Sequence, residues 1–218
     1  MKRTLFFAAF AAAALAAQSA SALTVGSYDT NNCYPFACLP TDNVAGVFQQ
    51  VYNAANFAGP TAIAAINLFQ GQAGEMDEAT FSVAWYISNS GYLSSSTTLS
   101  ANLGALLSDW GTVSIAGAMP TTLTIAGSTF TYDPTDGDLL LHVEVQSVTI
   151  MTNFDSFFQA DSGVSAIYRN FDGEIIGVNS GYALVTEFVT ADVPLPAAAP
   201  LLLGGLALIA GVARRRAA

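Results

Sequence analysis

The sequence predicts an all-β fold, a single antiparallel β-sandwich of jelly-roll type, over residues 23–192. Apolar and polar residues alternate with the two-residue period of a strand over 81–88 and again over 141–146. Glycine, serine, threonine and asparagine recur at short intervals, and no linker or repeat divides this segment. Short strands separated by turn signals are typical of an antiparallel sandwich and not of a parallel sheet.

The expected strands, in chain order, are 47–52, 62–69, 81–88, 112–116, 121–125, 129–132, 141–146, 164–171, 174–178 and 182–190. A helix is expected only over 101–110. Asp172-Gly173 predicts a type I′ hairpin, because both central residues of that turn need a positive φ. Asp133-Pro134-Thr135-Asp136-Gly137 predicts a second turn, with proline fixing φ and glycine where the chain reverses.

The charge distribution excludes most partners that are polyanions. The chain has 6 Lys and Arg against 16 Asp and Glu, and five of the bases lie at the two ends. Residues 23–192 keep only Arg169 and all sixteen acids, a formal charge of −15. A protein that binds nucleic acid or an anionic membrane surface needs clustered Lys and Arg, and this segment has none.

Residues 1–22 have the pattern of a signal peptide that signal peptidase removes. Two basic residues precede an apolar run over 5–17, which is shorter than the roughly 20 residues that span a bilayer. A small-x-small cleavage pattern follows, formed by Ala20 and Ala22, with Leu23 as the new first residue. An uncleaved N-terminal anchor is the alternative.

The C-terminal residues 193–218 combine a proline motif, an apolar segment and a basic end. Prolines hold the motif extended, as a processing enzyme requires. The apolar segment 197–213 is long enough to span hydrocarbon as a helix, and the arginines at 214–216 would stay cytoplasmic. The basic end argues against a lipid-anchor signal, whereas a permanent single-pass anchor stays open. The motif residues are Val193, Pro194, Leu195, Pro196 and Ala197.

This C-terminal arrangement resembles the VPLPA variant of the PEP-CTERM sorting signals. The resemblance implies cleavage near 194–197 by a membrane-embedded exosortase of a Gram-negative bacterium that makes exopolysaccharide. It further implies an inner-membrane intermediate and a final place at the cell surface or outside the cell. A second resemblance, to other exosortase-sorted exported proteins, implies no catalytic residues; it rests on 48–54, 57–60, 130–135, 139–141 and 181–186.

Few residues could carry catalysis, and no enzyme is predicted. His142 is the only histidine, and a triad or multi-histidine zinc site needs more partners. A carboxylate-dependent glycosidase stays as an alternative, with candidate acids Glu144, Asp155, Asp161 and Glu187. The cysteines, Cys33 and Cys38, are expected to form a disulfide in an exported protein, which would contribute about 2 kcal/mol.

Asp133, Asp136 and Asp138 are the candidate metal ligands, since three hard oxygen ligands around a glycine suit calcium. An acidic, solvated turn explains the same residues, and no other cofactor is expected. Aromatic side chains could stack on sugars in a carbohydrate-binding module; the candidates are Tyr28, Tyr34, Phe36, Tyr86, Tyr92 and Trp110. The sequence thus favours an exported matrix or surface protein with a structural or adhesive role, and exopolysaccharide as a candidate partner.

Overall fold

A computed structural model describes residues 22–37, 46–91, 96, 98–150, 155–163, 167–172 and 182–191. Every strand pairing among them is antiparallel, which confirms the predicted all-β class. The strands are β1 (Ala22–Val25), β2 (Thr30–Asn32), β3 (Val47–Tyr52), β4 (Thr61–Gln72), β5 (Glu75–Ser88), β6 (Leu103–Ala118), β7 (Thr122–Tyr132), β8 (Leu139–Ile150), β9 (Phe157–Asp161), β10 (Ile167–Asp172), β11 (Ala183–Leu184) and β12 (Thr186–Thr190). Short 3-10 helices are η1 (Ala54–Asn56), η2 (Leu99–Asn102) and η3 (Pro134–Asp136).

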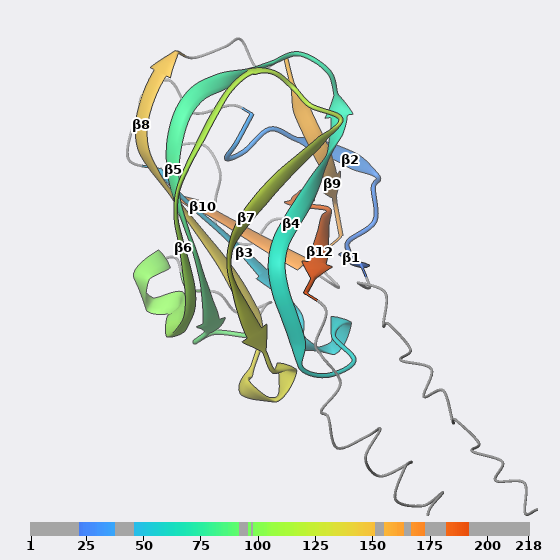
Figure 1. Ribbon diagram of the computed structural model, residues 1–218, viewed down its shortest axis with the longest axis vertical. Helices are drawn as coiled ribbons and strands as arrows, with labels where there is room; N and C mark the ends of the chain where they lie inside the picture. The colour runs from blue at the N-terminus through green and yellow to red at the C-terminus, as the bar shows by residue number, and fades with distance from the viewer. Residues whose placement is uncertain are drawn as a thin grey trace, which may run out of the picture. The chain divides into compact units, whose positions relative to one another are not determined.

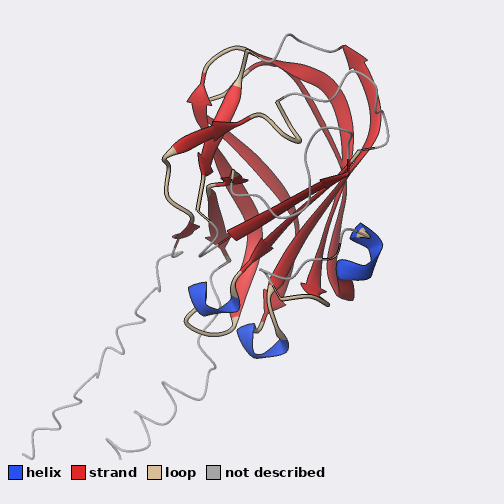
Figure 2. Cartoon of the chain, turned by 180° about the vertical axis from the view of Figure 1, so that it is seen from behind, coloured by secondary structure: helices blue, strands red, loops and turns tan. Residues whose placement is uncertain are grey.

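The strands form two sheets. One has the order β1-β12-β4-β9-β11, with β2 paired to β9 and β7 paired to β4. The other has the order β10-β3-β8-β5-β6. The chain passes between the sheets at the β4–β5 and β6–β7 connections, which lie at the same end in Figure 1. Figure 2 shows the short helices at the opposite end.

The strands around the centre are longer than the sequence suggested. The expected strands 121–125 and 129–132 are one continuous strand, β7, and β4 to β8 each have 11 to 16 residues. Register shifts in the β5–β6 pairing absorb the bends that such long strands need. A register shift in the β4–β7 pairing, between Ile63 and Ala65, lets β7 continue through Ala126-Gly127-Ser128.

The helix expected over 101–110 is wrong. Only η2 is helical there, and β6 runs from Leu103 through the rest of the segment. Ser108 and Trp110 are buried while Asp109 between them is exposed, which is the period of a strand. Pairing with β5 over its whole length outweighs the helix propensity of the alanine and leucine residues.

Several strand predictions are confirmed. β3 spans the predicted 47–52, and the alternating burial expected for 81–88 is present over 81–86 of β5. In β8 the predicted apolar residues Leu141, Val143 and Val145 are buried, but His142, expected on the opposite side, is buried as well. The segment 174–178 and Gly173 of the predicted hairpin lie outside the described residues, as do the predicted signal residues 1–21. In the structure β10 pairs with β3. The strands β1, β2 and β9 are not among those predicted from the sequence.

Residues Ala20–Ala191 form one compact unit. The predicted apolar helix 197–213 lies outside the described residues. Within the described residues, no helix has the length and apolar character needed to cross a membrane.

Aromatic side chains from both sheets meet in a shared core. The Tyr52 ring of β3 lies edge-on to Phe188 of β12, with 4.9 Å between centroids. Trp85 of β5 lies 5.8 Å from Phe130 of β7 and 5.2 Å from Trp110 of β6. Trp85, Tyr52 and Phe188 are fully buried. Edge-to-face packing of this kind adds to the free energy gained by burying the rings.

A buried polar network crosses the same core. The Gln50 Nε2 donates to Leu184 O at 2.8 Å and to the Tyr52 hydroxyl at 2.8 Å. Leu184 N in turn donates to Gln50 Oε1 at 2.8 Å, so the side-chain amide pairs with both backbone groups of Leu184. The Tyr52 and Thr186 hydroxyls lie 2.9 Å apart, and Thr186 Oγ1 donates to Leu184 O. The network therefore connects β3 of one sheet to β11 and β12 of the other.

Trp110 also bridges β6 and β7, because its Nε1 donates to Ser128 O at 3.0 Å. The indole lies against Gly127, where an added Cβ would overlap the base of the Trp110 ring. Gly127→Ala should therefore displace the indole and lower the free energy of unfolding by about 1–3 kcal/mol. Urea denaturation measures the change. Gly59→Ala is the control, since no atom lies within 4 Å of a Cβ at Gly59. Equal stability of the two variants would contradict the predicted overlap.

Candidate functional site

The predicted signal-cleavage residues lie at the start of the folded unit. Ala22 and Leu23 begin β1 and pair with Val189 and Phe188 of β12, while Ala20 lies outside the described residues. Because β1 and β12 are antiparallel neighbours, the chain enters and leaves this sheet side by side. Cleavage before Leu23 would leave the remaining residues of β1 paired to β12.

The predicted sorting motif follows closely after the last strand. β12 ends at Thr190, and Ala191 N still donates to Ala62 O of β4 at 2.9 Å. The motif residues Val193, Pro194, Leu195, Pro196 and Ala197 lie outside the described residues. Regular pairing therefore reaches to within two residues of the motif.

Cys33 is buried and takes part in a disulfide bond. A tight turn follows it, in which Ala37 N donates to Cys33 O at 2.7 Å. Cys38 lies outside the described residues, so the pairing of these two cysteines stays a prediction.

The acidic turn predicted to bind calcium is a capped helical turn. Asp133 Oδ1 accepts from Thr135 N at 2.9 Å and from Thr135 Oγ1 at 2.8 Å, at the start of η3. Asp138 Oδ1 accepts from Ala54 N at 2.8 Å, and Asp136 is exposed. In the part of the chain that the structure describes, no three His, Cys, Asp or Glu side chains form a group that could hold a metal ion. Calcium binding here stays a prediction from the sequence.

Tyr132 lies beneath this turn, and its hydroxyl donates to Gly137 O at 2.7 Å. Burial raises the pKa of Tyr132, and the nearby carboxylates of Asp138, Asp133 and Asp136 raise it further. The neutral phenol therefore holds the turn closed at any physiological pH. Gly137 has a φ of 125°, a conformation that favours glycine.

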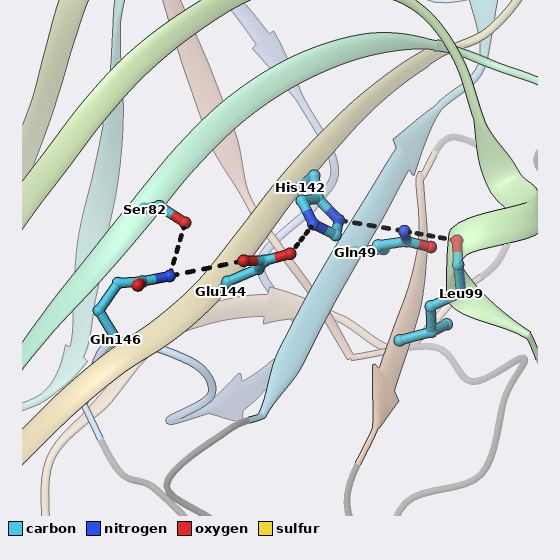
Figure 3. A network of polar contacts seen from close by, with 6 residues as sticks. All are labelled: Gln49, Ser82, Leu99, His142, Glu144 and Gln146. Carbon is cyan, nitrogen blue, oxygen red and sulfur yellow. Dashed lines mark hydrogen bonds and ion pairs between the residues drawn. The ribbon is translucent and has the colours of Figure 1, made fainter.

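His142 lies in the polar network that Figure 3 shows on the five-stranded sheet. Its Nε2 lies 3.0 Å from Glu144 Oε1, and its Nδ1 lies 3.1 Å from Gln49 Nε2. Gln49 Nε2 also donates to Leu99 O at 2.9 Å. Asn102 Nδ2 donates to Gln49 Oε1 at 2.9 Å, which fixes the orientation of the Gln49 amide. This orientation makes Nδ1 the acceptor and Nε2 the donor of a neutral imidazole.

Both ring nitrogens of His142 are therefore engaged within the chain. The residue is 7% exposed, so His142 is a buried, hydrogen-bonded residue of β8. The network attaches η2 to the sheet beside Tyr86, whose ring lies edge-on to the imidazole at 5.9 Å. This geometry suits a structural histidine and offers no nitrogen to a substrate.

The candidate glycosidase acids make separate hydrogen bonds; three lie in different strands, and Asp155 lies before β9. Glu144 of β8 contacts His142, and Glu187 of β12 accepts from Asn67 Nδ2 at 2.7 Å. Asp155 Oδ1 accepts from Glu75 N at 3.3 Å, before β9 begins. Asp161 ends β9, and its carboxylate accepts from Ser27 N and Gly163 N.

Two of the candidate sugar-stacking aromatics, Phe36 and Trp110, are buried. Phe36 is fully buried against Phe81 at 5.2 Å, and Trp110 is 8% exposed. Tyr34 and Tyr86 are half-buried, and Tyr92 lies outside the described residues. Tyr28 alone among the candidates is seen to be exposed. Among the described residues, three large hydrophobic side chains are exposed: Tyr28 at 52%, Tyr182 at 47% and Leu106 at 57%.

Tyr28 and Tyr182 flank the end of β9. Tyr28 precedes β2, in which Thr30 pairs with Ala160, and Tyr182 precedes β11, in which Ala183 pairs with Asp161. Because β2 and β11 lie on opposite edges of β9, the two tyrosine backbones are about two strand spacings apart, roughly 10 Å. We call Tyr28, Asp29, Asn31, Ser162 and Tyr182, all exposed, the tyrosine surface.

Two aspartate carboxylates accept the hydrogen bonds that hold the tyrosine surface in place. Both Asp29 carboxylate oxygens accept from Ser162, from its N at 2.8 Å and its Oγ at 2.7 Å. These bonds lower the pKa of Asp29. Asp161 Oδ2 accepts from Ser27 N at 2.7 Å, and Asp161 Oδ1 accepts from Gly163 N at 2.7 Å. The segment before β2 is thus tied to the end of β9 and to the residues that follow it.

Tyr182 has a φ of 70°, a backbone conformation uncommon for a residue other than glycine. Its N donates to Asp161 O at 2.6 Å, and its O accepts from the buried Asn32 Nδ2 at 2.8 Å. These two bonds hold the residue in a strained conformation with its ring exposed. The sequence placed Tyr182 at the start of a strand, and no local signal distinguishes its exposure.

Comparison with protein-family models, curated proteins and solved structures finds no match to this chain.

The stabilisation of the turn by the Asp133 cap should depend on pH. The hydrogen bonds from Thr135 lower the pKa of Asp133 below its ordinary 3.8. The stabilisation from this cap is therefore complete above the unfolded pKa and is lost as pH falls through the lower folded value. Carbon-detected NMR titration should find the Asp133 carboxyl titrating below 3.8, and Thr135→Val should move it upward. An Asp133 carboxyl that titrates at 3.8 or higher would contradict the capped geometry.

Proposed function

We propose that this protein is an exported cell-surface or extracellular-matrix protein with a structural or adhesive role, cut at its C-terminus by an exosortase. The observation that carries the proposal is the order of the C-terminal features, proline motif, apolar segment and arginine triplet. Signal peptidase would act at the other end, between Ala22 and Leu23. The host would be a Gram-negative bacterium, with an inner-membrane intermediate before release.

The limits of the folded unit support this route. β1 begins at Ala22 and β12 ends at Thr190, so cleavage before Leu23 and near 194–197 would remove one residue of β1 and leave the other strands whole. β1 and β12 are neighbours, so both ends of the unit leave one sheet together. A precursor held at both ends in the same membrane would satisfy this geometry without stretching the fold.

An adhesive or structural role also fits the contents of the unit. We propose that the two sheets form a β-sandwich, which the ring contacts between β3 and β12 and between β5 and β7 support. His142 is engaged on both nitrogens, and the candidate acids make separate bonds, so a glycosidase is the less favoured alternative. A net charge of −15 over 23–192 would keep such a protein soluble after release.

Mass spectrometry of the protein recovered outside the inner membrane tests the proposal. The expected polypeptide begins at Leu23 and lacks the arginines at 214–216, because each peptidase removes its own signal. A recovered protein that still carries the arginine triplet would refute exosortase processing.

A matched pair of variants locates the cleavage signal. Pro194→Ala combined with Pro196→Ala should leave the arginine triplet attached and the protein in the membrane fraction, because the motif loses its fixed extended backbone. Pro200→Ala, in the apolar segment beyond the motif, should be processed normally. Equal processing of both variants would show that the motif is not the recognition element.

A further inference from the structure

We propose that the tyrosine surface binds a neutral polysaccharide, with Tyr28 and Tyr182 as the two stacking groups. The proposal rests on the proposed function only in taking the ligand to be a polysaccharide of the matrix. The surface itself is defined by the exposed rings on the two edges of β9.

The rings of Tyr28 and Tyr182 are exposed to solvent. The aromatic side chains of Phe36, Trp85 and Phe188 are buried, whereas Tyr28 and Tyr182 are 52% and 47% exposed near the same strand end. Tyrosine offers a rigid, flat, amphipathic contact at low cost in conformational entropy. The backbones of the two tyrosines lie about 10 Å apart on the two edges of β9, so an extended chain could contact both residues. A polymer is therefore favoured over a single small sugar.

The tyrosine surface is held in place before a ligand binds. Asp29 holds Ser162 through two hydrogen bonds, and Asp161 holds Ser27 and Gly163 through one bond each. Asp161 O and Asn32 Nδ2 fix the backbone of Tyr182. Little ordering is then required when a ligand binds, so less of the interaction free energy is lost. The same bonds maintain the positive φ of Tyr182, whose ring is exposed.

Charge selects the class of polysaccharide. Asp29 lies within the surface and Asp161 at its base, and residues 23–192 carry a formal charge of −15. An acidic polysaccharide would meet like charge from the side chains and from the whole unit. A neutral chain of sugar rings has apolar faces for the tyrosines and hydroxyl groups for Asn31 and Ser162.

Affinity electrophoresis in native gels tests the proposal on the protein as the exporting cell delivers it. The gels contain hydroxyethylcellulose, galactomannan or dextran as neutral probes and alginate as the acidic probe. We expect retardation of the wild type by at least one neutral polymer and none by alginate. No retardation by any neutral polymer, or equal retardation by alginate, would overturn the proposal. The gels detect binding whether or not the C-terminus has been cut, so this result is independent of the processing test.

Variants assign the binding to the two rings. Tyr28→Ala and Tyr182→Gly should each weaken binding about tenfold, because each removes one stacking group. Glycine adopts a positive φ without strain, so Tyr182→Gly removes the ring while favouring the native backbone. Tyr182→Phe should retain binding. Leu106→Ala is the matched control, since Leu106 is equally exposed on β6 and lies outside the surface. Unchanged binding in Tyr182→Gly, or the same loss in Leu106→Ala, would overturn the assignment.

Discussion

The side-chain amide of Gln50 joins the two sheets at Leu184, and both residues are buried. In antiparallel pairing, alternate residues point their backbone groups away from the partner strand. Val185 N bonds to Gln159 O of β9, so the N and O of Leu184 face the other way, and Gln50 occupies both. The side chain thus replaces the neighbouring strand that β11 lacks on that edge. Leaving those groups unpaired would cost about 1–3 kcal/mol each, because no water reaches them.

The same network holds β12 in place. Thr186, the first residue of β12, belongs to the Gln50 network, and β12 lies between β1 and β4. Burial of Phe188 against Tyr52 adds an apolar contact to the polar one. β12 is therefore held by these core contacts and by strand pairing on both of its edges. A proposed cleavage a few residues beyond Thr190 would leave these interactions intact.

Strand positions with one apolar face could be predicted from the sequence, and long-range polar contacts could not. The alternation of apolar and polar residues predicted β5 and β8, and the sequence from Asp133 to Gly137 predicted the turn between β7 and β8. Gln50 reads locally as a polar interruption in β3, because its partners are 134 residues away in the chain. For the candidate site, composition identified Tyr28 but not Tyr182. The exposure of Tyr182 depends on Asn32 and on the end of β9, which are distant in sequence.

Native-state hydrogen exchange at the Leu184 amide tests most directly whether Gln50 holds the two sheets together. In the wild type this amide should exchange only through global unfolding, as a fully buried donor to Gln50 Oε1. Gln50→Leu should lower the free energy of unfolding by about 2 kcal/mol or more and expose the Leu184 amide through local opening. Gln146→Leu, at an exposed position of β8, is the control and should change neither quantity. Leu184 protection that is the same in both variants would contradict the account.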